Sequence, residues 1–128
     1  MSIEITYLVW TLLLAVVQIF LTAAVKTSVF GLKWNMSARD EPREPTRLTS
    51  RLERAQANLF ETLPIFIGGV LVVQMMGAAD ERTALGVQLY FWARLIYVPL
   101  YALGVPVIRT LVWAVGFAGL MMVLLALI

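Results

Sequence analysis

The sequence predicts an all-α integral membrane protein, a bundle of four transmembrane helices in a single domain. Of its 128 residues, 61% are hydrophobic, whereas soluble domains average about 45–50%. Four apolar stretches lie at residues 3–25, 59–79, 84–101 and 105–128, and each approaches the ~20 residues that cross a ~30 Å hydrocarbon core as a helix. None alternates apolar and polar residues as the strands of a membrane barrel do. Four helices therefore account for nearly all of residues 1–128.

A long polar connection separates the first two helices. The first helix is expected over about residues 3–30. It is interpreted as a membrane span and not as a secretory signal, because its apolar run exceeds the ~7–15-residue core of such a signal and no basic segment precedes it. The connection follows at about residues 33–50, where Pro42 and Pro45 break any helix. Seven of the ten Lys and Arg residues lie in or beside it. Since loops rich in Lys and Arg stay in the cytoplasm, this loop is predicted to be cytoplasmic, with both termini on the opposite side.

The second helix is expected over about residues 51–79. Thr49 or Ser50 is a suitable N-cap, and Glu53 stands three residues after Ser50 as the reciprocal partner of a capping box. The helix would then continue without interruption from a polar first turn into the second apolar stretch.

Two short turns define the remaining helices. The segment GAADERT precedes a third helix over about residues 83–103, which should lie antiparallel to the second. Gly104 and Pro106 mark the next turn, and the fourth helix is expected over about residues 105–128. Its GFAG segment, residues 116–119, offers small side chains at which helices approach closely.

The segment RLERAQANLFETLPIF, at the start of the second helix, carries a polar stripe. At 100° per residue, Arg51, Arg54, Asn58 and Glu61 fall within one arc of about 80°. Polar groups inside a membrane span face the bundle interior, where they pair with one another or serve a function. Interhelical hydrogen bonding by Asn58 and snorkelling of the two arginines to the interface are the structural alternatives.

The third helix carries a matching stripe in which Arg94, Tyr97 and Tyr101 share an arc of about 60°. Arg94 lies in the middle of the span and needs a carboxylate, and Glu61 is taken as the only carboxylate inside a span. The sequence therefore predicts a buried Glu61–Arg94 pair, whose role is either to fix helix register or to build a site. The two tyrosines fit either that site or an interfacial aromatic belt.

The residue types present limit the chemistry. With no cysteine and no histidine, disulfides, thiol nucleophiles, imidazole bases and the usual zinc ligands are excluded, and no metal site is expected. The net charge of +2 gives no argument for a nucleic-acid partner. Guanidinium groups bind carboxylates, so the stripes suit an anionic peptide whose thiol is the missing nucleophile, together with a hydrophobic substrate arriving through the lipid.

These residues also resemble a known family. RLERAQANLFETLPIF closely resembles the R-x-x-R-A-x-x-N-x-x-E signature of the MAPEG family, the membrane-associated proteins in eicosanoid and glutathione metabolism. A second segment, ARLIYVPLYALGVPVIRTL, is similar to the third-helix arginine and tyrosines of that family, followed by the arginine that opens its fourth helix. The resemblance extends over essentially the whole chain, which looks like a bacterial-type member that resembles the microsomal glutathione transferases.

The resemblance implies a homotrimer of four-helix protomers that binds glutathione between neighbouring subunits on the cytoplasmic side. Arg109 would lie nearest the thiol as the catalytic arginine. A basic residue of the neighbouring subunit would also reach glutathione, with Lys33 as the candidate and Lys26 and Arg39 as alternatives. The other implied glutathione contacts are Arg51, Arg54, Asn58, Glu61, Arg94, Tyr97 and Tyr101.

Two functions are therefore considered. The first is a glutathione-dependent membrane transferase or peroxidase that acts on hydrophobic electrophiles or lipid hydroperoxides. The second is a non-catalytic membrane protein of the same fold, whose polar stripe holds the trimer together or binds a lipid headgroup. A transporter is disfavoured, because the sequence shows no inverted repeat and no broken, glycine-rich half-helices.

Overall fold

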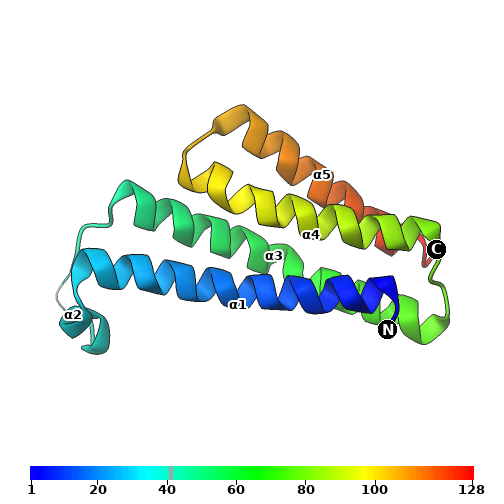
Figure 1. Cartoon of the computed structure of the whole chain (residues 1–128), viewed down its shortest axis with the longest axis horizontal. Coiled ribbons are helices and arrows are strands. Elements are labelled where there is room, and N and C mark those ends of the chain that lie inside the picture. Colours follow the sequence, from blue (N-terminus) through cyan, green and yellow to red (C-terminus); the bar gives the residue numbers. More distant parts are fainter. Residues whose placement is uncertain (41) are drawn as a thin grey trace.

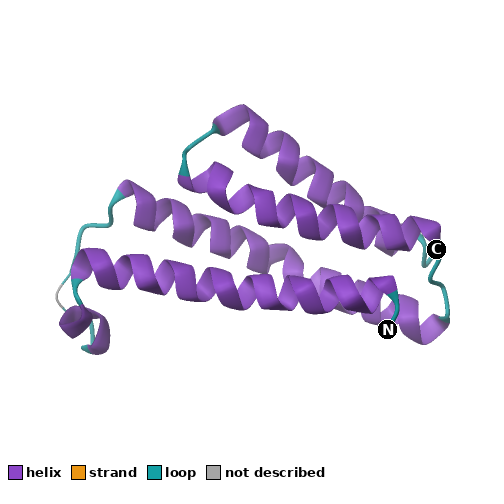
Figure 2. Cartoon of the chain, in the orientation of Figure 1, coloured by secondary structure: helices purple, strands orange, loops and turns teal. Residues whose placement is uncertain are grey.

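The computed structural model describes residues 1–40 and 42–128, and this part of the chain folds into helices joined by short connections, without a strand (Figures 1 and 2). The prediction of an all-α chain is confirmed. Both ends of the chain lie at the same end of the bundle (Figure 1). The elements in chain order are α1 (Ile3–Phe30), α2 (Leu32–Met36), α3 (Arg47–Met76), α4 (Glu81–Ala102) and α5 (Pro106–Leu125).

Three of the four long helices, namely α1, α3 and α5, are long and apolar enough to cross a membrane. The fourth, α4, is not among them, although its 22 residues suffice in length. Its composition explains the difference, because Gln88, Arg94 and three tyrosines dilute its apolar residues. The short α2 helix, which the sequence did not predict, packs on α1 alone.

Helix α3 begins earlier than the sequence suggested. Its N-cap is Thr46, whose side-chain oxygen accepts a hydrogen bond from the Thr49 backbone N–H at 3.1 Å. The predicted start near Arg51 and the capping box of Ser50 are therefore wrong. Thr46 directly follows Pro45, which cannot continue a helix, and it is the first side chain after the break that can cap one. Glu53 instead pairs with Lys26 of α1 at 2.5 Å.

The core lies between α1, α3 and α4 and includes Leu120 and Val123 of α5, which packs mainly on α4. Phe66 stacks on Tyr90 with ring centroids 4.0 Å apart, and the hydroxyl groups of Thr62 and Tyr90 form a 2.7 Å hydrogen bond inside it. This polar contact fixes the register of α3 against α4 in the segment that carries the polar stripes.

Small residues bring α4 and α5 together. A Cβ added to Gly119 would lie 2.5 Å from the backbone oxygen of Gly86, and one added to Gly86 would lie 2.6 Å from the oxygen of Gly119. Gly116 faces Ala93 in the same way, at 3.1 Å. The GFAG segment is therefore used for close packing inside one chain.

A buried carboxylate lies at the end of the bundle opposite the stripes. Glu4 is 4% exposed, and its Oε1 accepts a hydrogen bond from the hydroxyl of Thr83 at 2.8 Å. It stands in the first turn of α1, where the helix dipole favours negative charge. The expectation that Glu61 is the only carboxylate within a span is therefore wrong.

Candidate functional site

Polar and aromatic side chains of α3, α4 and α5 surround a cavity of about 210 Å³ near the α4–α5 turn. The helical periodicity of both stripes explains why they meet here, since each presents its polar arc on one side of its helix. The cavity also includes Thr110 and Trp113, which the sequence analysis did not single out. Trp113 stands four residues after Arg109 and so shares its side of α5, whereas Thr110 directly follows Arg109 in the chain. The lining residues are Asn58, Tyr97, Tyr101, Arg109, Thr110 and Trp113.

Arg94 is the most buried cation of the site, with 3% of its surface exposed. Its Nη1 donates a hydrogen bond of 2.8 Å to Oδ1 of Asn58, and its guanidinium carbon lies 4.5 Å from the centre of the Tyr97 ring. Its Nε is buried and has no hydrogen-bond partner among the described residues. The site therefore holds a buried positive charge with hydrogen-bonding capacity left over.

The predicted Glu61–Arg94 ion pair does not form. Glu61 is exposed, and the described ion pairs do not include it. In a helix, Asn58 and Glu61 differ by about 60° in direction, and α3 is rotated so that Asn58 faces α4. The neutral amide of Asn58 takes the place expected for the carboxylate of Glu61, so the guanidinium charge of Arg94 is left uncompensated.

Two further arginines converge on Tyr101. The guanidinium carbon of Arg109 lies 4.5 Å from the ring centre and that of Arg54 lies 5.8 Å from it. Tyr97 packs edge-on against the same ring, with centroids 5.4 Å apart. Cation–π attraction holds the guanidinium groups near the ring, and neither arginine appears in an ion pair of the described residues. The arrangement is a cationic centre built on aromatic rings.

Arg51 is engaged with the turn between α4 and α5. Its Nη1 donates to the backbone oxygen of Ala102 at 3.3 Å, which satisfies a carbonyl that the end of α4 leaves free. Its guanidinium lies against Gly104, where an added Cβ would approach it to 2.8 Å. Arg51 thus ties the start of α3 to the turn that precedes Arg109.

Replacing Gly104 with alanine is expected to reduce the free energy of unfolding by about 2 kcal/mol. Roughly half comes from its left-handed backbone, with φ 74°, which disfavours a Cβ by about 1 kcal/mol, and the rest from losing the Arg51 hydrogen bond. Gly77→Ala is the matched control, because Gly77 has φ 64° and open space around it. Denaturant titration in detergent micelles measures both variants, and equal losses would contradict the Arg51 contribution.

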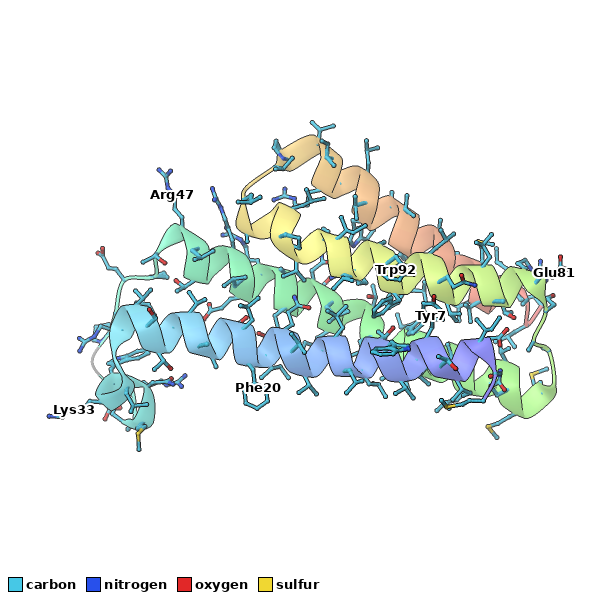
Figure 3. The ribbon with its side chains drawn as sticks, in the orientation of Figure 1. Tyr7, Phe20, Lys33, Arg47, Glu81 and Trp92 are labelled. Carbon is cyan, nitrogen blue, oxygen red and sulfur yellow. The ribbon has the colours of Figure 1, made fainter. Side chains whose placement is uncertain are left out.

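Lys33 is not brought to this cluster within one chain. It is exposed on α2, and α2 contacts α1 but neither α4 nor α5. Figure 3 shows it beyond the end of α1. The two alternatives to Lys33 as the basic residue that reaches glutathione also lie away from this cluster. Lys26 pairs with Glu53, and the Arg39 guanidinium donates to Asn35.

The fold and this site define the class of the protein, an integral membrane protein of packed helices with a cationic, aromatic-lined site between them. Residues 7–128 match the MAPEG family, and the chain belongs to that family of membrane-associated proteins in eicosanoid and glutathione metabolism. The resemblance seen in the sequence is thereby confirmed. No curated protein and no solved structure matches the chain.

Proposed function

We propose that the protein is a glutathione-dependent membrane transferase or peroxidase acting on hydrophobic electrophiles or lipid hydroperoxides. Membership of the MAPEG family supports glutathione as the thiol substrate. The convergence of Arg54 and Arg109 on Tyr101, beside the buried guanidinium of Arg94, is the observation that carries the proposal.

The residues of the site fit glutathione chemically. Glutathione has two carboxylates and a net negative charge, and guanidinium groups bind carboxylates through paired hydrogen bonds. Arg54 and Arg109 each carry a guanidinium group that takes part in no ion pair of the described residues. The amide of Asn58, which already orients Arg94, has donors for a peptide carbonyl.

Arg109 is the residue proposed to act on the reacting atoms. Glutathione supplies a thiol, the nucleophile that this cysteine-free chain lacks. A fixed cation beside a thiol lowers the thiol pKa from about 8.5 and raises the thiolate fraction at neutral pH. Arg109 also stabilises negative charge that develops on the electrophile, and Tyr101 holds its guanidinium in place. In conjugation, the carbon–sulfur bond forms as the leaving group departs with its electron pair, and the thiol proton passes to solvent.

We also propose that the protein forms a homotrimer and that the polar loop at about residues 33–50 lies in the cytoplasm. Seven of the ten Lys and Arg residues lie in or beside that loop, which supports this orientation. In such a trimer, Lys33 contributes to the site of a neighbouring subunit. The hydrophobic substrate reaches the cavity from the surrounding lipid, past the apolar surface of α5.

Calorimetric titration of glutathione, and of S-methylglutathione, into the detergent-purified protein tests the binding site. Saturable binding of both ligands is expected, and Arg54→Ala should weaken it by about 10–100-fold through loss of a charge-assisted contact. Arg47→Ala is the control, because Arg47 is an exposed arginine at the start of the same helix. Failure of both ligands to bind a folded sample would reject the proposal.

A non-catalytic scaffold is the second candidate. The bonds of Arg51 to Ala102 and of Arg94 to Asn58 favour it, because they join helices without any ligand. In that case, Arg94→Met and Arg51→Met would lower the free energy of unfolding, while the wild-type protein would not bind glutathione at all.

A further inference from the structure

A second basic pocket lies where the chain leaves α1. It has a volume of about 470 Å³ and is lined by the end of α1, by α2 and by the loop after it, remote from α4 and α5. Three cations line it, namely Lys33, Arg39 and Arg43, together with the ring of Trp34. Asp40 is the acidic residue in the lining, so the described walls carry a net positive charge.

The Arg39 side chain is held in position. Its Nε and Nη2 donate to the backbone oxygen of Asn35 at 3.4 and 3.3 Å, and its guanidinium lies 5.4 Å from the centre of the Trp34 ring. Asn35 is itself tied to α1, because its Nδ2 donates to Thr27 at 2.8 Å. Nη1 of Arg39 takes no part in these bonds and remains available to a ligand.

Apolar side chains stand exposed beside these cations. Leu32 is 60% exposed and Met36 is 77% exposed, and both lie on α2, which contacts α1 alone. Since α1 is long and apolar enough to cross a membrane, α2 lies at the membrane boundary. A short helix that combines exposed apolar residues with Lys or Arg at this depth is suited to the interface between acyl chains and headgroups.

We propose that this pocket binds the headgroup of an anionic phospholipid of the adjacent leaflet. The phosphate would lie between Lys33 and Arg39, where charge-assisted hydrogen bonds are available. Leu32 and Met36 would enter the acyl region, and Trp34 would lie at the headgroup level that tryptophan prefers. A membrane lipid fits better than a soluble anion, because the exposed apolar residues need acyl chains beside the phosphate.

Quenching of Trp34 fluorescence by brominated lipids tests the proposal. The full-length protein is reconstituted in nanodiscs of phosphatidylcholine with about one fifth phosphatidylglycerol, and either lipid carries bromine in turn. The signal of Trp34 is the difference between wild type and Trp34→Phe. Brominated phosphatidylglycerol is expected to quench it several-fold more than its share of the bilayer predicts. This preference should vanish in Arg39→Gln and in Lys33→Gln.

Arg47→Gln is the matched control, because Arg47 is exposed on α3 and does not line the pocket; it should keep the preference. Equal quenching by both lipids, or the same loss in Arg47→Gln, would overturn the proposal. So would displacement of the lipid by millimolar inorganic phosphate, which would assign the pocket to a soluble anion. Glutathione is left out of the assay, because Lys33 is also proposed to reach the glutathione site of a neighbouring subunit, and the lipid result then stands or falls apart from that function.

Discussion

Arg109→Ala is expected to lower the rate of glutathione conjugation by about 100–1000-fold, the loss typical for a single group that stabilises developing charge. The guanidinium of Arg109 lies over Tyr101 at the cavity wall, and it is the cation assigned to the thiolate. Stopped-flow measurement with a hydrophobic aryl chloride gives the rate, and ultraviolet difference absorbance gives the thiolate fraction. Both should fall together.

The control for this variant separates charge from geometry. Arg109→Lys keeps the positive charge without the planar fork, so it should keep part of the thiolate absorbance. S-Methylglutathione, which has no thiol, should bind Arg109→Ala nearly as well as wild type, because its carboxylates are assigned to other arginines. Undiminished thiolate in Arg109→Ala would remove Arg109 from the catalytic role.

Gly119→Ala is expected to give the largest loss of stability, about 3 kcal/mol, the upper part of the range for overpacking. The new Cβ would lie 2.5 Å from the backbone oxygen of Gly86 and 2.9 Å from the backbone nitrogen of Tyr90. Backbone atoms cannot rotate away as a side chain does, so α4 and α5 must separate. Unfolding by a denaturing detergent in mixed micelles measures the change in free energy.

Gly68→Ala is the control for helix propensity. Gly68 lies inside α3 and has no atom within 4 Å of an added Cβ. Alanine there should be neutral or stabilising by up to about 1 kcal/mol, because it favours the helix. If the free energy of unfolding fell no further in Gly119→Ala than in Gly68→Ala, the close approach of α4 and α5 would not be needed for stability.

The helices were predictable because long apolar runs and proline breaks are local signals. The start of α3 was not, since Thr46, Thr49 and Ser50 are all good N-caps and the choice depended on Pro45. The α2 helix gave no signal, because five residues are too few to form a stable helix alone. It exists through its packing on α1, which no periodicity reveals.

The site was predictable only in part. Periodicity places the stripes of Asn58 and of Arg94 on arcs that meet, but the sequence paired Arg94 with Glu61, whereas the structure pairs it with Asn58 at 2.8 Å. Periodicity does not give the rotation of each helix against its neighbour, and a difference of about 60° decided that Asn58 rather than Glu61 faces Arg94. Arg51 was assigned to a ligand from its place in the stripe. Its hydrogen bond to the end of α4 joins residues far apart in the sequence, so no local pattern could predict it. The roles of these residues toward glutathione stay predictions.

The tight pairing of α4 with α5 bears on how the protein is made. An arginine at the centre of a helix opposes insertion into the membrane by about 2.5–3.5 kcal/mol, and Arg94 is buried within α4. The more apolar α5 follows after only three residues and closes on α4 through Gly86 and Gly119. We therefore expect the ribosome to deliver the two as a helical hairpin, so that α4 enters the bilayer only after α5 has left the ribosomal tunnel.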